Sequence, residues 1–343
     1  MRRNLLITFI VIFSFTGINA QTTRVLFLGN SYTYVNNLDQ MVKDFALAMG
    51  DTLEVQRNTP GGYTLGHPDG GHLYNETSLS MIAEGGWDYV VLQDQSQFPT
   101  IPFFRDNYSY PAAIELAELI REASPDASPV FFMTWGRKFG GQQCIQDYCS
   151  ADFVDFFHMQ DTLAASYNHM AESVDGLCAP VGNAWGAAIS DGDPINLFSA
   201  DNSHPSLAGT YLAACTFYAT LTGNSPEGCT YNAGLDGDIA LFLQQKADSV
   251  VFSVNTGASL IEEQKVKIYP NPANSNVHIE LPKGHNFKRF ELKNSIGKTL
   301  FCDDIYREQN SLRISVDDLI GGIYFINLIS ASKVSALKIL IAN

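Results

Sequence analysis

The sequence predicts an α/β domain with a parallel sheet, followed by a small all-β sandwich. From residue 23 to about 253, short apolar runs alternate with helical patterns, and strands buried under helices on both faces are typical of a parallel sheet. After about residue 255 only short strands separated by Gly, Asn and Pro turns remain, which is typical of a sandwich. Apolar residues make up 45% of the 343 residues, enough for packed cores.

Five apolar runs bounded by Gly, Pro or Asp are the expected strands of the sheet. They are residues 25–28, 53–55, 89–92, 130–134 and 179–181. Helices are expected at residues 38–49, from Pro111 onward, and at 152–174, 206–222 and 236–252. We expect the first helix to open with Asn37 and Gln40 as a capping pair and to close at Gly50.

The expected strands of the sandwich are shorter and more closely spaced. They are residues 266–269, 277–281, 290–293, 312–316, 323–328 and 336–341. The N-terminus has the pattern of an export signal, with Arg2 and Arg3, an apolar run at 5–15 and small residues up to Ala20. We therefore expect a signal peptide at 1–20, the α/β domain at 21–254, a linker at 255–264 and the sandwich at 265–343.

The charge is concentrated between the two ends of the chain. The net charge is −15, and residues 21–263 carry 8 basic against 29 acidic side chains. Such a surface repels phosphate backbones and anionic lipids, which argues against nucleic acid and favours a neutral or cationic substrate. After the signal no segment reaches 18 uninterrupted apolar residues, so stable membrane insertion is not expected.

Export makes the six cysteines candidates for disulfides. Cys144 with Cys149, and Cys215 with Cys229, are the two expected pairs, whereas Cys178 and Cys302 are expected to stay unpaired. No CxxC pair or His cluster at metal-site spacing is present, and no cofactor is indicated.

Two separate segments supply the parts of a serine hydrolase. Ser31 follows the first apolar strand at a sharp turn, and Asp201 and His204 lie three residues apart on a loop far downstream. An imidazole oriented by a carboxylate can act as general base for a serine. Taken singly, Ser31 is equally typical of a turn serine, and the Asp201–His204 pair of a capping loop before the next helix.

Four short motifs together resemble the SGNH (GDSL-like) hydrolases. They are Gly29-Asn30-Ser31, Gly61-Gly62, Gln93-Asp94-Gln95-Ser96 and Asp201-x-x-His204, in the order and spacing of that family over residues 23–223. The resemblance implies a flavodoxin-like three-layer α/β/α sandwich and ester hydrolysis through an acyl-enzyme. It implies a nucleophile at Ser31, a triad completed by Asp201 and His204, and an oxyanion hole with the backbone amides of Ser31 and Gly62.

The chain departs from the family at two of these motifs. Asn30 stands where the family has Asp, and Gln95 stands at the position of the family's oxyanion asparagine. The resemblance therefore implies Gln95 as an oxyanion donor, with Gln93 as the second candidate. Side chains near the expected strand ends are candidates for a substrate pocket, with core packing as the alternative for the two Trp residues. These are Tyr32, Tyr63, His67, Trp135, Arg137, Lys138 and Trp185.

The C-terminal region has a resemblance of its own. The segment from Val266 to Ala273, Ile296-Gly297-Lys298 and the segment from Leu319 to Tyr324 resemble the C-terminal sorting domain of the type IX secretion system. This implies the type IX machinery as a partner, a Bacteroidota source, and a secreted or surface-attached protein. A carbohydrate-binding module is the alternative.

The function we expect is a secreted esterase that removes acetyl or another small acyl group, with carbohydrate as the expected alcohol. A lipase or thioesterase is the alternative enzyme. A non-catalytic glycan-binding surface protein is the alternative outside enzymes.

Overall fold

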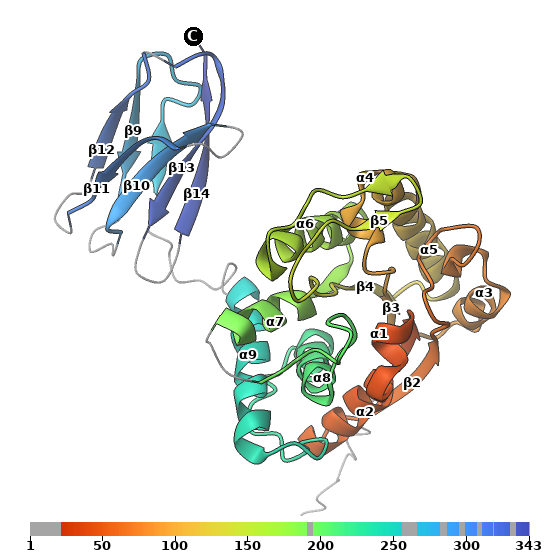
Figure 1. Ribbon diagram of the computed structural model, residues 1–343. Helices are drawn as coiled ribbons and strands as arrows, with labels where there is room; N and C mark the ends of the chain where they lie inside the picture. Colours follow the sequence, from red (N-terminus) through yellow and green to blue (C-terminus); the bar gives the residue numbers. More distant parts are fainter. Residues whose placement is uncertain are drawn as a thin grey trace, which may run out of the picture. The chain divides into compact units, whose positions relative to one another are not determined.

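The first of two compact units is built on a five-stranded parallel sheet (Figure 1). The computed structural model describes residues 22–190, 195–255, 266–281, 287–294, 299–306, 311–317, 319–329 and 334–342. The expected signal peptide, and residues 256–264 of the expected linker, lie outside these ranges. The two units are Met1–Gly257 and Ala258–Asn343, and each is described by itself.

The strands of the sheet have the order of a flavodoxin-like fold. They are β1 (Thr23–Leu28), β2 (Leu53–Asn58), β3 (Tyr89–Leu92), β4 (Ser128–Phe132) and β7 (Leu177–Ala179). Their order is β2-β1-β3-β4-β7, and every neighbouring pair is parallel. This 2-1-3-4-5 order has its topological switch between β1 and β3, the place where ligands bind in open α/β sheets.

Helices and short turns connect the strands. The α-helices are α1 (Ser31–Tyr34), α2 (Leu38–Met49), α3 (Glu76–Ala83), α4 (Pro102–Phe104), α5 (Tyr110–Ala123), α6 (Phe156–Ser173), α7 (Val181–Ser190), α8 (Leu207–Thr222) and α9 (Gly237–Asn255). The short 3₁₀ helices are η1 (Val35–Asn37), η2 (His72–Tyr74) and η3 (Phe98–Thr100), and η4 (Arg105–Ser109) is a π-helix. A two-stranded hairpin, β5 (Cys144–Ile145) and β6 (Tyr148–Cys149), precedes α6.

Alternate residues of β1 point into two separate cores. Val25 and Phe27 pack with α2, α7, α8 and α9 on one face, whereas Leu26 and Leu28 pack with α3, α5 and α6 on the other. All four side chains are fully buried. Because successive strand residues face opposite sides, a strand buried on both faces is apolar throughout. The expected three-layer α/β/α sandwich is confirmed.

Some expectations about element boundaries and caps are wrong. The fourth strand is Ser128–Phe132, two residues earlier than the expected 130–134. The fifth strand ends at Ala179, and Val181 begins α7 instead of closing the strand. Asn37 precedes α2 but makes no cap: its φ is 52°, and its side-chain oxygen accepts a hydrogen bond from Arg57. Gln40 donates to Asp44 one turn along the helix. The left-handed backbone at Asn37 turns its side chain toward β2 instead of toward the first turn of α2.

The second unit consists of two antiparallel sheets around one apolar core. Strands β11 (Thr299–Asp304), β10 (Arg289–Asn294), β13 (Gly322–Ile329) and β14 (Val334–Ile341) form one sheet. Strands β12 (Ser311–Ser315), β9 (Asn276–Glu280) and β8 (Lys267–Tyr269) form the other. Val277 and Ile279 of β9 and Ile326 and Leu328 of β13 meet in the core. The expected small all-β sandwich is confirmed.

The cysteines only partly follow the expected pairing. Cys144 and Cys149 form a disulfide, whereas Cys215 and Cys229 are free thiols, so the second expected pair is wrong. Cys215 is buried in α8, and the Cys229 thiol points toward the carbonyl oxygen of Phe45. Cys178 and Cys302 are unpaired, as expected. Within the described residues, no helix has the length and apolar character needed to cross a membrane.

Candidate active site

Ser31 lies directly after β1, at the sheet's topological switch. Gly29 joins the strand to this turn, and a Cβ on it would lie only 2.6 Å from Gln93 Oε1 and from Thr33 Oγ1. A glycine is therefore needed for β1 to end this close to the loop after β3. Ser31 is the first residue of α1, a four-residue helix that ends before the Asn36–Asn37 kink, so the long helix α2 does not begin at the serine.

Ser31, His204 and Asp201 form one continuous hydrogen-bonded chain. His204 Nε2 lies 2.8 Å from Ser31 Oγ, and His204 Nδ1 lies 2.5 Å from Asp201 Oδ2. The histidine side chain is about one-third exposed and the aspartate about half exposed. With the proton on Nδ1 donated to Asp201, Nε2 is free to accept the serine proton. The structure thus brings together the three side chains that the two distant motifs supply.

The loop between Phe198 and Pro205 fixes the carboxylate. Asp201 Oδ1 accepts hydrogen bonds from the backbone amides of Ser203 and His204 and from Ser199 Oγ. Desolvation opposes the charged form of Asp201, but its hydrogen bonds from the His204 ring and these amides outweigh that effect. The pKa of Asp201 therefore lies well below its usual range, and the carboxylate stays ionised.

Asn30 ties three segments of the site together. Its Nδ2 donates to the carbonyl oxygen of Tyr63 at 2.8 Å and to that of Asp94 at 3.4 Å. Its Oδ1 accepts from the Tyr32 amide and from Gln93 Nε2, at 3.2 and 2.6 Å. A carboxylate at this position has no proton to donate to the two carbonyl oxygens. These contacts account for the asparagine at this position.

Gln93 belongs to the same network and is not available as an oxyanion donor. Its Nε2 donates to Asn30 Oδ1 and to the carbonyl oxygen of Asp94, and its Oε1 accepts from the Asn30 amide and Thr33 Oγ1. The side chain is completely buried. With both amide protons donated, Gln93 is a structural residue of the turn, and this second candidate is withdrawn.

The Gln95 side chain forms its hydrogen bonds with Gln97, two residues along the chain. Its Nε2 donates to Gln97 Oε1 at 3.0 Å, and its Oε1 accepts from the Gln97 amide at 2.7 Å. Its own amide donates to buried Asp94. Gly62, on the loop after β2, has a φ of 72°, a conformation that favours glycine. Gly62 itself is exposed, and Tyr63 beside it bonds to Asn30.

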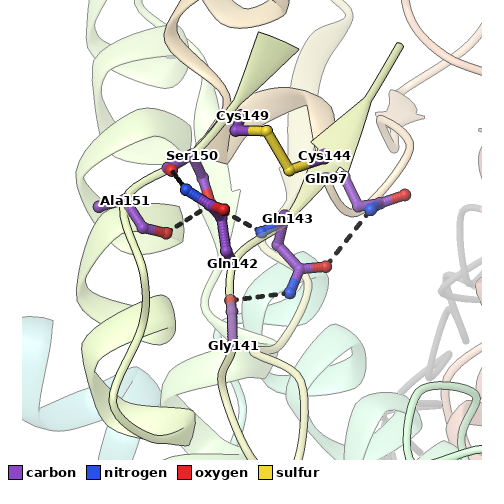
Figure 2. Close-up of a disulfide and its surroundings, with 8 residues drawn as sticks. All are labelled: Gln97, Gly141, Gln142, Gln143, Cys144, Cys149, Ser150 and Ala151. Atoms are coloured by element: carbon purple, nitrogen blue, oxygen red, sulfur yellow. Dashed lines mark hydrogen bonds between the residues drawn. A yellow bond between two sulfur atoms is a disulfide. The ribbon is translucent and has the colours of Figure 1, made fainter. Parts of the chain in front are cut away.

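The disulfide hairpin contacts the loop after β3 through Gln97 (Figure 2). Gln97 Nε2 donates to Gln143 Oε1, and Gln143 Nε2 donates to the carbonyl oxygen of Gly141. Gln143 and Ser150 extend the hairpin by one pair, because the Ser150 amide donates to the Gln143 carbonyl oxygen and the Gln143 amide to Ser150 Oγ. A run of carboxamides therefore links Gln95 to the base of the disulfide.

Two buried titratable groups hold the loops of the site: Asp94, which belongs to the third motif, and His72, which the sequence did not indicate. His72 Nε2 lies 3.0 Å from the Gly29 carbonyl oxygen, and its Nδ1 lies 2.7 Å from Ser78 Oγ. Burial lowers the pKa of His72 to about 4. Asp94 accepts hydrogen bonds from the amides of Leu65 and Gln95 and from Ser109 Oγ, yet burial raises its pKa to about 6.

The expected aromatic pocket residues divide into two groups. Trp135 and Trp185 stack at 3.9 Å and are 1% and 0% exposed, so they pack in the core. Tyr32 stacks on Trp135 and lies edge-on to the His204 ring at 5.3 Å. The Tyr63 hydroxyl accepts from Asn75, and the His67 ring packs beside Phe98 and Tyr108, so both rings hold loops.

Among the expected pocket residues, Arg137 contacts the Tyr32 side chain, which lies beside His204. Its Nη1 donates to the Tyr32 hydroxyl at 2.6 Å, and that hydroxyl lies 2.6 Å from Ser203 Oγ, next to His204. Its neighbour Lys138 lines a pocket together with Asn196 and Phe198, and Lys138 Nζ donates to Asn196 Oδ1. No group of three His, Cys, Asp or Glu side chains that could hold a metal ion occurs in the described part of the chain.

Comparisons with known proteins identify the C-terminal unit and the fold of the first unit. Residues 267–342 match the family described as the secretion system C-terminal sorting domain. A crystal structure of a DUF4886 family protein from Bacteroides uniformis is similar over 72% of this chain and 100% of that one, with 20% identity and a TM-score of 0.55.

More distant structures are also similar. A putative GDSL-like lipase from Parabacteroides merdae shares 16% identity over 60% of this chain and 98% of its own, with a TM-score of 0.43. A carbohydrate esterase family 3 protein from Talaromyces cellulolyticus shares 10% identity over 59% of this chain and 97% of its own, with a TM-score of 0.40. No curated protein matches the sequence.

Proposed function

We propose that this chain, which carries a secretion system C-terminal sorting domain, is a secreted serine esterase that removes small acyl groups, chiefly acetyl, from carbohydrate. The observation that carries the proposal is the hydrogen-bonded chain from Ser31 through His204 to Asp201. Its position at the switch of a flavodoxin-like sheet supports a site open to ligand.

The proposed reaction proceeds through an acyl-enzyme. His204 Nε2 takes the Ser31 proton while Oγ bonds to the ester carbonyl carbon. The bond to the alcohol oxygen then breaks, and His204 gives its proton to that oxygen. In the second half, a water molecule loses a proton to His204, its oxygen bonds to the acyl carbon, and Ser31 leaves with the proton as the carboxylic acid departs. Asp201 holds the ring in the required tautomer and stabilises its protonated form.

We propose the backbone amides of Ser31 and Gly62 and the Gln95 carboxamide as oxyanion donors. Gln95 Nε2 donates one of its two protons to Gln97, so in this proposal the second proton is donated to the carbonyl oxygen as negative charge develops. The two backbone amides act on the same oxygen.

The carbohydrate portion of the proposal is supported by location. The sorting domain indicates secretion or attachment to the cell surface and implies contact with the type IX secretion machinery. We also propose a Bacteroidota source, a signal peptide at residues 1–20, a catalytic domain at 21–254, a linker at 255–264 and a sorting domain at 265–343.

The direct test is hydrolysis of p-nitrophenyl acetate, butyrate and octanoate by the full chain and its Ser31→Ala variant. We expect turnover by the wild type and a loss of at least about 10⁴-fold in the variant, as for other triad serines. Thermal unfolding of both proteins is the control for folding. Preference for acetate supports the small-acyl proposal, and preference for octanoate favours a lipase. Equal rates for the two proteins on all three esters would refute the esterase.

A further inference from the structure

We propose that Arg137 binds a carboxylate on the substrate, and that the enzyme therefore selects esters of acidic compounds. On a carbohydrate, such an ester is an acylated acidic sugar. This inference rests on the proposed function, because it assigns the substrate class of the same site. It differs from the neutral or cationic substrate that the overall charge predicts.

The loop that carries Arg137 is fixed by its backbone. The Gly136 amide donates to Gln160 Oε1, the Arg137 amide to Met159 Sδ, and the Lys138 amide to the Asn202 carbonyl oxygen. The first two bonds attach the loop to α6, and the third attaches it to the Asp201–His204 loop. The Arg137 side chain is therefore not needed to hold its own loop in place.

The Arg137 guanidinium donates only one hydrogen bond within the described residues. A guanidinium has five N–H groups, and that one bond goes to the Tyr32 hydroxyl. The side chain is only partly buried. Because a neutral hydroxyl leaves the charge uncompensated, the remaining N–H groups suit a carboxylate, which matches the planar fork of arginine.

The other arginines in the described part of the first unit have different partners. Arg24, Arg57 and Arg105 form ion pairs with Glu54, Asp39 and Asp106. Arg121 donates to the carbonyl oxygens of Val174 and Asp175. Arg137 forms no ion pair with any carboxylate in the described ranges, although acidic side chains greatly outnumber basic ones around it. Arg121 also lacks a carboxylate partner, but two carbonyl oxygens hold its guanidinium, whereas Arg137 has a single hydroxyl partner and leaves room for a negatively charged ligand.

Its position is close to the reacting groups. The Tyr32 hydroxyl that Arg137 contacts also contacts Ser203, and the Tyr32 ring lies 5.3 Å from the His204 ring. Local contact outweighs the acidic surface because exposed charges more than about 8–10 Å apart are largely screened at physiological ionic strength. A charged ester that reaches the site therefore interacts more strongly with the Arg137 guanidinium than with the distant carboxylates. The nearby Asp201 carboxylate is already bonded to the His204 ring and to two backbone amides.

The test uses two pairs of esters, each with a charged member and its neutral methyl ester. In one pair the alcohol part carries the carboxylate: 3-acetoxybenzoate and methyl 3-acetoxybenzoate. In the other the acyl part carries it: p-nitrophenyl hydrogen succinate and p-nitrophenyl methyl succinate. For each pair we measure the ratio of kcat/KM for the charged ester to that for the neutral one. We expect Arg137→Gln to lower that ratio about 10- to 100-fold in one pair, which identifies the side of the ester that faces Arg137.

Two variants separate binding from other roles. Lys138→Gln removes the same charge one residue away and is expected to keep the ratio, because Lys138 Nζ faces Asn196. Tyr32→Phe removes the contact with Arg137 but keeps the guanidinium, and is expected to keep the ratio whatever its effect on neutral esters.

Two results would overturn the inference. If Arg137→Gln slows both members of each pair by one factor, Arg137 is only a support for Tyr32, although the esterase stands. If the wild type is no faster than Ser31→Ala on all four esters, the proposed function fails together with the inference.

Discussion

At the scale of single residues, Asn30 shows how one carboxamide can organise the turn that carries Ser31. It donates to two carbonyl oxygens and accepts from two N–H groups that come from the loops after β1, β2 and β3. Such two-way bonding needs a neutral amide. Replacing the amide with a carboxylate removes both donors and adds a negative charge beside the two carbonyl oxygens.

We therefore expect Asn30→Asp to lower the free energy of unfolding by at least about 1–3 kcal/mol, the cost of leaving buried polar groups unsatisfied. Urea denaturation measures this. Asn37→Asp is the matched control, because exposed Asn37 uses only its oxygen, to accept from Arg57, and a carboxylate preserves that bond. It is expected to change stability by less than about 0.5 kcal/mol. Equal effects of the two substitutions would contradict this account of Asn30.

The contact of Ser31 with His204 and Asp201 could be predicted from the sequence, because each side chain belongs to a motif with fixed spacing. The contacts of Asn30, Gln93 and Gln95 could not. A carboxamide has donors and acceptors that fit many partners, and sequence spacing does not choose among them. The use of Trp135 as core was undecided for a related reason, since aromatic rings suit both a core and a pocket.

At the scale of secondary-structure elements, the β5–β6 hairpin depends on its disulfide. Two two-residue strands give little stability alone. Tyr148 stacks on Phe103 at 3.6 Å, and Gln143 accepts a hydrogen bond from Gln97. Through these contacts the hairpin stabilises the loop that carries Gln95.

We expect the double variant Cys144→Ser/Cys149→Ser to lose about 2 kcal/mol of stability, the loop-closure effect of a crosslink this short. Urea denaturation with and without reductant checks it: the wild type should weaken in reductant, and the variant should not respond. Cys302→Ser, which changes a thiol in the other unit, is the control and should behave like the wild type. If the free energy of unfolding of the wild type is the same with and without reductant, the prediction is wrong.

Most long elements with a buried apolar face were predicted, but α7 was missed although Val181, Ala184 and Trp185 are buried in it. Strand β11 was missed because all six of its residues are exposed and it pairs only with β10. An edge strand of this kind carries no alternation of buried and exposed side chains. By contrast, α2 was predicted with both ends correct because its buried residues recur at helical spacing and Gly50 closes it with a φ of 93°.

At the scale of the whole molecule, two buried groups give opposite contributions to the pH dependence of stability. The pKa of His72 is lowered from 6.5 to about 4, so below pH 6.5 the unfolded chain binds a proton that the folded one does not, and acid destabilises the fold. The pKa of Asp94 is raised from 3.8 to about 6, so between these values the folded chain binds the extra proton, and acid stabilises the fold.

We expect each contribution to reach about 3 kcal/mol and the two largely to cancel between pH 6 and pH 4. Free energies of unfolding at pH 7 and pH 5 test this. In His72→Gln the fold should gain stability on acidification relative to the wild type, and in Asp94→Asn it should lose stability. The same change with pH in both variants would contradict the assignment.

The overall fold was the most predictable feature. Five apolar strands alternating with helices admit few arrangements, since parallel connections are right-handed and the strands must be buried on both faces. The free thiols of Cys215 and Cys229 illustrate the limit of such reasoning. Their neighbourhood in space follows from the fold, but the direction of each thiol depends on local packing.

The disulfide of the β5–β6 hairpin also sets an order of events. Disulfides form in oxidising compartments and are kept reduced inside most cells, whereas the sorting domain directs this chain outward. The disulfide of the hairpin that bonds to Gln97 therefore forms only after the chain has left the reducing interior. A preparation made under reducing conditions will hold an immature form of this loop, and oxidation after purification is the step that completes it.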